Sequence, residues 1–277
     1  MSPSEVATAG GEGGGLVPYS TSVQGSPCDT IFPPGGFFID TAAARLARLK
    51  SGVLTAARLI GEELRSSPLR HRPWMTTLTY RPGETWKPYH ITGCLKCIRR
   101  WADRRGIRFC YVWVAEIQEK RYRNGGLIGE CVHYHLVVWL PVSMSMPMAD
   151  KQGWWPWGMT QRVKVAAPMS YLTKYVSKGG GVEFPKGLRL HGSGGISAEG
   201  RNERAWWALP RWVRVIWQPS DMPRRCKGGG FYSCVSSRWF PSIFRVSLRF
   251  GSVYCCLRDD LLLFFPIALL YKILEVL

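Results

Sequence analysis

The chain has 277 residues, of which 46 % are hydrophobic, so it is long and apolar enough to fold around a core, which excludes a chain that is disordered throughout. Its 37 Lys and Arg residues outnumber 19 Asp and Glu residues and give a net charge of +18, which favours a polyanionic partner, either nucleic acid or an anionic membrane surface. Thirteen Trp residues favour nucleic acid, because bases stack on indole rings and on guanidinium planes.

The start of the chain is predicted to contain a disordered segment and then a helix. Residues 1–38 are rich in Gly, Ser and Pro, and they lack the basic start and apolar run of a signal peptide. We therefore expect a cytoplasmic protein whose nine cysteines are reduced thiols. From Asp40 to Ser66 the apolar residues recur at helical spacing, which predicts a leading helix within a segment that spans residues 39–71.

The next segment, residues 72–182, is predicted to be a domain of alternating strands and helices. A polar stretch over Glu119–Glu130 predicts a long turn inside it. The order of elements indicates an α+β fold with a central antiparallel sheet of about four to five strands flanked by helices. Strands are predicted over Trp74–Tyr80, Ile107–Gln118, Cys131–Leu140 and Thr160–Val165, and helices over Pro88–Arg105 and Pro168–Lys178.

Two segments of different character are expected after this domain. Residues 183–235 form a basic, Trp-rich extension that is predicted to be mostly loop, and residues 236–277 form an apolar tail. The most apolar part, Leu261–Leu277, is shorter than the roughly 20 residues that a membrane span usually needs, and charged residues interrupt it. A docked helix or an altered chain end is therefore favoured over a role in the membrane.

Two histidines on one predicted strand are candidate metal ligands. Successive side chains of a strand point to opposite faces, so His133 and His135 project to the same side and Tyr134 points away. Two neutral imidazoles on one face can share a divalent ion. A pair of histidines that is satisfied by other contacts has the same spacing and is the competing interpretation.

A third ligand is expected from the neighbouring strand. A hairpin between Gln118 and Cys131 would set the two strands antiparallel, and Glu116 would then lie beside the histidines. Gln118 and Glu119 are alternatives for the same role, and a solvated carboxylate at a strand end is the competing interpretation of Glu116. The pattern predicts two imidazoles and one carboxylate around one ion.

The last predicted helix of the domain carries two tyrosines and two lysines on one stripe. A phenol has a pKa near 10, so it needs help to act as a nucleophile. A nearby ammonium group and a metal-bound phosphate would favour the phenolate and offset charge in the transition state. Since an unpaired buried ammonium group is costly, the lysines predict that the stripe faces a polar cleft. At positions i, i+3, i+4 and i+7 it consists of Tyr171, Lys174, Tyr175 and Lys178.

Three motifs in this order resemble those of a known family, the HUH endonuclease superfamily. The similarity is closest to the replication initiators of filamentous bacteriophages and related rolling-circle elements. It covers roughly residues 72–180, whereas the chain after about residue 235 does not resemble the family. The motifs are Thr76, Leu78, Thr79 and Tyr80, then His133-Tyr134-His135, then Tyr171-x-x-Lys174 overlapped by Tyr175-x-x-Lys178.

The resemblance implies a site-specific, single-strand DNA endonuclease and strand transferase that starts rolling-circle replication. Its nucleophiles would be Tyr171 and Tyr175, which form a 5′-phosphotyrosine and release a 3′-hydroxyl, while Lys174 and Lys178 offset charge. The implied cofactor is Mg²⁺ or Mn²⁺, and the implied ligands are His133, His135 and Glu116.

The same resemblance implies the partners of the protein. They would be single-stranded or supercoiled origin DNA in a bacterial host cell, together with a host polymerase that extends the 3′-hydroxyl. The sequence contains no GxxxxGK[ST] phosphate loop, so unwinding is expected from a separate host helicase.

Two alternative functions remain open from the sequence. An HUH transposase or mobilisation relaxase uses the same histidine and tyrosine motifs. A non-catalytic single-stranded DNA-binding protein would need the charge, the tryptophans and a sheet, but neither the histidine pair nor the tyrosine stripe.

Two further features of the predicted helix over Pro88–Arg105 have a bland interpretation beside a functional one. Cys94 and Cys97 form a single CxxC without a second pair, which favours two thiols on a helix over a zinc site. Its basic face is predicted to track the DNA backbone, although a solvated face is an equal description. That face consists of Arg99, Arg100, Arg104 and Arg105, with Lys96 beside them.

Overall fold

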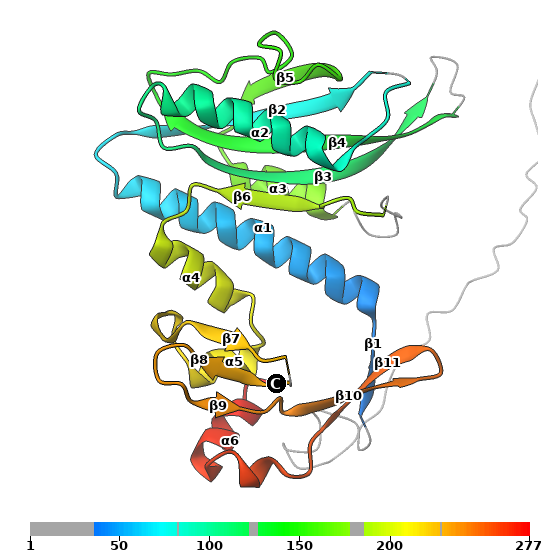
Figure 1. The fold of residues 1–277 in the computed structure, drawn as a ribbon, viewed down its shortest axis with the longest axis vertical. Coiled ribbons are helices and arrows are strands. Elements are labelled where there is room, and N and C mark those ends of the chain that lie inside the picture. Colours follow the sequence, from blue (N-terminus) through cyan, green and yellow to red (C-terminus); the bar gives the residue numbers. More distant parts are fainter. Residues whose placement is uncertain (1–35, 82, 122–126, 178–185, 228) are drawn as a thin grey trace, which may run out of the picture. The chain divides into compact units, whose positions relative to one another are not determined.

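A five-stranded antiparallel sheet contains the predicted histidine strand (Figure 1). The computed structural model describes residues 36–81, 83–121, 127–177, 186–227 and 229–277, so most of the segment predicted to be disordered lies outside it. The strand order is β5-β2-β4-β3-β6, and each neighbouring pair is antiparallel, which confirms the predicted α+β fold. The strands are β2 (His71–Tyr80), β3 (Cys110–Arg121), β4 (Leu127–Pro141), β5 (Gly158–Lys164) and β6 (His191–Gly194).

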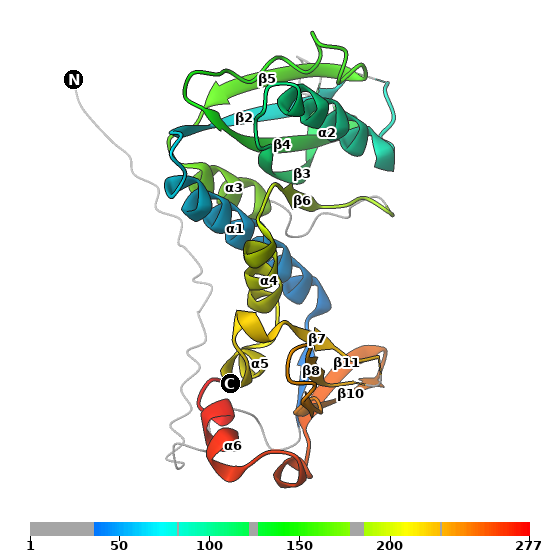
Figure 2. The same ribbon diagram turned by 60° about the vertical axis from the view of Figure 1, so that its left-hand side comes forward.

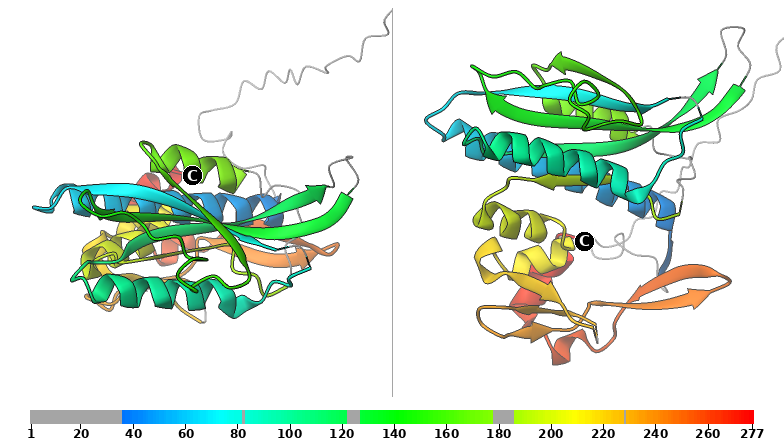
Figure 3. Two further views of the ribbon diagram at one scale, coloured as in Figure 1. Left: turned by 90° about the horizontal axis from the view of Figure 1, so that it is seen from above. Right: turned by 45° about the horizontal axis from the view of Figure 1, so that its top comes forward.

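Helices cover both faces of this sheet. On one face, Tyr134 and the other even-numbered residues of the middle of β4 pack in an apolar cluster with α2 (Pro88–Asp103). On the opposite face, Val137 packs in a second cluster with α1 (Thr41–Arg65) and α3 (Pro168–Ser177). The view from above in Figure 3 shows α2 and α3 on opposite sides of the sheet. A side chain's parity along β4 therefore decides which helices it meets.

The long helix α1 agrees with the helix predicted over Asp40–Ser66. The carboxylate of Asp40 accepts hydrogen bonds from the backbone N–H groups of Ala42 and Ala43, both at 2.9 Å, and so caps the helix. One side of α1 packs against α3 and β3. Its buried residues are Leu49, Val53, Ala56, Ala57, Leu59, Ile60 and Leu64.

The helix α2 agrees with the prediction over Pro88–Arg105. Pro88 stands in its first turn, where the missing N–H has no intrahelical partner to lose. Cys94 is fully buried, and burial raises the pKa of its thiol to about 12. Cys94 and Cys97 are both free thiols, in agreement with the simpler interpretation of the CxxC motif.

The prediction of a long turn over Glu119–Glu130 is wrong. The backbone of β3 continues to Arg121 and that of β4 begins at Leu127, so the paired strands extend into the polar stretch. Antiparallel backbone pairing continues there although the stretch lacks the apolar alternation that marks a half-buried strand.

The prediction that the stretch after residue 182 is mostly loop is also wrong. Its residues His191–Gly194 form the edge strand β6, which pairs with β3. Two glycines hide this strand in the sequence, and both are needed because neighbouring rings come close. A Cβ at Gly192 would meet the indole of Trp113, and one at Gly194 would meet the ring of Tyr111. The stretch also contains the helices α4 (Ala198–Trp207) and α5 (Arg211–Ile216).

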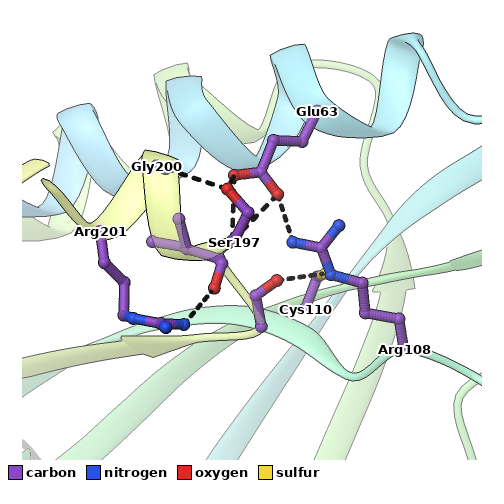
Figure 4. A network of polar contacts seen from close by, with 8 residues as sticks. Glu63, Arg108, Cys110, Ser197, Gly200 and Arg201 are labelled. Carbon is purple, nitrogen blue, oxygen red and sulfur yellow. Dashed lines mark hydrogen bonds and ion pairs between the residues drawn. The ribbon is translucent and has the colours of Figure 1, made fainter. Parts of the chain in front are cut away.

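A polar network attaches α4 to α1 (Figure 4; Figure 2 shows the two helices). The carboxylate of Glu63 on α1 accepts hydrogen bonds from the backbone N–H and hydroxyl of Ser197, the N-cap of α4, and forms an ion pair with Arg108. Burial by itself would raise the pKa of Glu63, but the hydrogen bonds from Arg108 and Ser197 outweigh it and lower the pKa. The network therefore requires an ionised Glu63.

The C-terminal residues pack around a third apolar cluster, to which Trp212, Phe240 and Ile273 contribute. The helix α6 (Ile267–Leu274) contacts α5, as expected of a docked helix. Within the residues that the structure describes, none of the helices is long and apolar enough to cross a membrane. The other elements of this part are η1 (Pro219–Asp221), β7 (Pro223–Arg225), β8 (Phe231–Ser233), β9 (Trp239–Phe240), η2 (Leu261–Leu263), β10 (Phe244–Arg249) and β11 (Ser252–Leu257), which pairs with β1 (Phe37–Ile39).

Candidate functional site

Polar residues of β2, β3 and β4 gather on the sheet face that α1 and α3 cover. In the strand register, His133 lies opposite Thr79 of β2 and Glu116 of β3, and His135 lies opposite Thr77 of β2. Cross-strand partners share a face, so all five side chains project to the same side. We call these five residues the histidine site.

The histidine site is buried. His133, His135 and Glu116 are 8 %, 5 % and 6 % exposed. The Oε2 atom of Glu116 lies 2.6 Å from Nε2 of His135, which is a hydrogen-bonding distance. Buried polar groups are costly unless they are paired, and this bond pairs two of them. The structure thus brings together the three residues predicted as ligands.

Two threonines contact the other ring nitrogens of the histidines. The hydroxyl of Thr79 lies 3.1 Å from Nδ1 of His133, and the hydroxyl of Thr77 lies 3.3 Å from Nδ1 of His135. A partner at Nδ1 fixes the orientation of an imidazole and determines which nitrogen is available to a ligand. The threonines therefore aim both Nε2 atoms away from β2.

Thr77 is a site residue that the sequence analysis missed. Of the first motif, Thr79 faces the histidine site, but Thr76 points to the opposite face. Among the described residues, the buried hydroxyl of Thr76 has no hydrogen-bond partner. The alternation of β2 together with its register to β4 would have identified Thr77, but that register is not visible in the sequence.

The helix α3 places Tyr175 directly on the histidine site. The phenol ring stacks on the imidazole of His135, with ring centroids 3.5 Å apart and an interplanar angle of 11°. Leu172 and Val176 of the same helix are buried in the apolar cluster and hold α3 against the sheet. The ammonium group of Lys174 is exposed and lies 5.9 Å from the centroid of the Tyr175 ring.

The remaining residues predicted on the tyrosine stripe lie further from the histidines or outside the structure. Tyr171 is one helical turn before Tyr175 and is 39 % exposed, so its phenol is open to solvent. Lys178 lies outside the described residues, and so do the side chains of Gln118 and Glu119, the alternative third ligands.

The two tyrosines of the first and second motifs are poor candidates for nucleophiles. Tyr80 and Tyr134 are buried in the apolar cluster on the α2 side of the sheet. Burial raises the pKa of both phenols, that of Tyr134 to about 12, so they stay protonated near neutral pH. Tyr171 and Tyr175 are then the motif tyrosines on the face of the histidine site.

The histidine site has the donor types that bind divalent cations, namely imidazole nitrogen and carboxylate oxygen. Among the described residues, no group of three or more His, Cys, Asp or Glu side chains is arranged to hold a metal ion as it stands. The bond between Glu116 and His135 joins two of the donors to each other. Binding of a cation would therefore require a side-chain rotation, which a carboxylate at the end of two rotatable bonds allows.

The arginines predicted to bind DNA lie on the other side of the sheet. All four are exposed on or just after α2, the helix opposite α3. The guanidinium of Arg99 lies 5.8 Å from the ring centroid of Phe109, and that of Arg105 lies 4.9 Å from the centroid of Trp101. The basic face therefore exists, but it is separated from the histidine site by the sheet. Its members are Arg99, Arg100, Arg104 and Arg105.

The central part of the chain is similar to a known family. Residues 73–180 match the sequence model of a family of replication-associated proteins, whose description begins "Replication-associated protein ORF2". The match covers less than half of the chain, and it includes the histidine site and Tyr175. No curated protein and no solved structure matches the chain significantly. The match confirms the predicted similarity to a replication-associated protein family and supports a role in DNA replication.

Proposed function

We propose that this protein is a rolling-circle DNA replication initiator that nicks one DNA strand and becomes joined to it through a tyrosine, in the cytoplasm of a bacterial host cell. The observation that carries the proposal is the stacking of the Tyr175 ring on His135, at 3.5 Å between centroids, beside Glu116 and His133. The similarity of residues 73–180 to replication-associated proteins supports the same function.

A divalent cation, Mg²⁺ or Mn²⁺, is part of the proposal. His133, His135 and Glu116 would hold it, because they combine two imidazoles and one carboxylate on a single face. The threonine contacts at both Nδ1 atoms fit this role, since metal-binding histidines usually make a second bond through the other nitrogen. When bound, the cation would act as a Lewis acid on the phosphate that is cut.

Tyr175 would make the first attack. Its phenolic oxygen loses its proton to solvent and attacks phosphorus, the bond from phosphorus to the 3′-oxygen breaks, and that oxygen takes up a proton from solvent to leave as a 3′-hydroxyl. The 5′-phosphate stays on the tyrosine as a phosphodiester. Lys174, exposed near the ring, would offset the charge that develops on phosphate, and Lys178 is proposed for the same task.

Tyr171 would be the second nucleophile. It stands one turn from Tyr175 on α3, and its exposed phenol is accessible to a second DNA strand. Two tyrosines on one helix allow one to hold a strand while the other attacks the next junction. Such an exchange releases a closed circle without hydrolysing a phosphodiester bond.

An assay for a covalent adduct tests this proposal. The protein would be incubated with single-stranded oligonucleotides that tile the DNA around its gene, in Mn²⁺ or Mg²⁺, and analysed on a denaturing gel. We expect an adduct that survives SDS and that is absent with EDTA and in a His133→Ala/His135→Ala variant. Equal adduct formation with EDTA would contradict the role of the metal. Binding without any adduct would favour a non-catalytic single-stranded DNA-binding protein.

The same assay, extended to products, separates the initiator from a transposase or relaxase. An initiator leaves a 3′-hydroxyl that a polymerase extends on a circular template. We expect added polymerase and helicase to produce unit-length single-stranded circles from a nicked supercoiled plasmid. Transfer of the bound strand into an unrelated target molecule would instead indicate a transposase.

A further inference from the structure

A basic groove lies on the same side of the sheet as the histidine site, between the N-terminal half of α1 and the chain that leads into β6. It has a volume of about 510 Å³. Its polar lining consists of the guanidinium groups of Arg45, Arg48 and Arg189 and the imidazole of His191. No carboxylate lines it among the described residues, although the same helix carries several glutamates further along.

The three arginines of this groove are available to a ligand. All three side chains are exposed, and within the described part of the chain none of them forms an ion pair. Arg48 donates only its Nε–H, to the carbonyl of Ala44 in its own helix, so its terminal nitrogens remain open. Three guanidinium groups without a counter-charge repel each other, and a polyanion in the groove relieves that repulsion.

Burial of His191 makes the lining of the groove purely cationic or neutral. Its side chain lies close to Gly52 of α1, where a Cβ would stand 3.3 Å from the imidazole. Burial, followed by the charges of Arg204 and Arg189, lowers the pKa of His191, so the ring is neutral at pH 7. It can therefore donate or accept one hydrogen bond without opposing the arginines.

The strand register connects the groove to the histidine site. His191 pairs with Val114 of β3, and Val114 pairs in turn with His135 of β4. The three residues form one row across the sheet on the face that α1 and α3 cover. Neighbouring strands lie about 4.8 Å apart, so the groove begins about 10 Å from His135. That is within reach of a DNA strand whose reacting phosphate lies at the histidine site.

We propose that this groove binds the sugar–phosphate backbone of the single DNA strand on which the histidine site acts. The inference rests on the proposed function and assigns the path of its substrate. Arginine suits the task because its planar fork can bind phosphate oxygens in pairs. Such contacts hold the strand in register without reading its sequence. The arginines of α2 lie on the opposite face, so a strand bound by them would not run along this row.

The test compares two variants with the same loss of charge. Arg45→Gln/Arg48→Gln/Arg189→Gln alters the groove, and Arg99→Gln/Arg100→Gln/Arg104→Gln alters the α2 face. Binding of a short fluorescein-labelled single-stranded oligonucleotide would be followed by anisotropy in EDTA at increasing NaCl. We expect the groove variant to bind about 10- to 100-fold more weakly at moderate salt. The slope of its log Kd against log salt should fall by about 2, because three contacts to single strands are lost.

The α2 variant should bind within about 2-fold of the native chain, with an unchanged salt slope. An unchanged affinity and slope in the groove variant, or a larger loss in the α2 variant, would overturn the inference. Circular dichroism melting of both variants checks that exposed Arg→Gln changes leave the fold intact.

The outcome is separable from that of the proposed function, because the binding assay contains no metal. A His133→Ala/His135→Ala variant should bind as the native chain does in EDTA and still form no adduct in Mn²⁺. If the groove variant binds weakly while the native chain forms no adduct, the groove is a DNA-binding surface and the nicking proposal is wrong.

Discussion

The phenol ring of Tyr175 lies flat on the imidazole of His135, with an angle of 11° between the ring planes. One of these residues comes from a central strand of the sheet and the other from a helix that packs on it. The contact places the proposed nucleophile beside a proposed metal ligand before any substrate is present. Such preorganisation reduces the reorganisation that a reaction at phosphate requires.

Removal of one oxygen from Tyr175 should separate its chemistry from its packing. Tyr175→Phe keeps the stacked ring on His135, so we expect an unchanged melting temperature and at least about a 10³-fold slower first nick. Tyr171→Phe should nick at a rate close to that of the native chain but fail to release closed circles. Single-turnover gel assays measure both rates. A Tyr175→Phe protein that nicks normally would transfer the role to Tyr171.

The hydroxyl of Thr79 should tune metal affinity through His133. Thr79→Val removes the partner of Nδ1, at 3.1 Å, with little change of volume, and we expect Mn²⁺ binding to weaken by about 10- to 100-fold. Thr79→Ser should restore most of the affinity. Thr76→Val is the matched control on the opposite face of β2, and it should leave Mn²⁺ affinity unchanged. Isothermal titration calorimetry gives all four values, and an equal loss in both valine variants would contradict the account.

Gly158 should be intolerant of even a methyl group. It pairs with Tyr80 where β5 meets β2, and a Cβ there would collide with the carbonyl oxygen of Thr79. We expect Gly158→Ala to cost about 1 to 3 kcal/mol of unfolding free energy and to weaken Mn²⁺ binding, because Thr79 must shift. Gly153→Ala adds a methyl group in open space at a positive φ, so it should cost stability alone. Chemical denaturation and calorimetry compare the two variants.

The network around Glu63 predicts a pH dependence of stability. Because its pKa is lowered in the folded state, Glu63 stabilises the fold above its unfolded pKa of about 4.3, and this contribution is lost as pH falls through the lower folded pKa. Glu63→Gln should therefore cost about 1 to 2 kcal/mol at pH 7 and almost nothing near pH 2. Urea titrations at a series of pH values measure the difference. A difference that persists unchanged at low pH would contradict the ionised network.

The sequence was sufficient to predict the elements that carry the strongest periodic patterns. The apolar spacing from Asp40 to Ser66 predicted α1, and the alternation around His133 and His135 predicted both the strand and the shared face of the imidazoles. Glu116 was predicted beside them because a hairpin fixes which residues of two successive strands can meet. Local patterns and short connections therefore determined most of the site.

The rest depended on contacts between distant segments. The edge strand β6 contains two glycines and little apolar signal, and it exists because the backbone of β3 pairs with it. Thr77 belongs to the site through the register of β2 against β4, which no local pattern specifies. The stacking of Tyr175 on His135 depends on how α3 packs, so the sequence identified both residues but not their contact.

The most direct test of the central claim is to identify the tyrosine that carries DNA. After reaction with origin-bearing single-stranded DNA in Mn²⁺, nuclease trimming and tandem mass spectrometry would locate the remaining nucleotide on a peptide. We expect a 5′-linked nucleotide on Tyr175 at early times, and on Tyr171 as well once strands are exchanged. A nucleotide linked to any residue outside α3, or a DNA 5′-phosphate released without linkage to protein, would contradict the proposed mechanism.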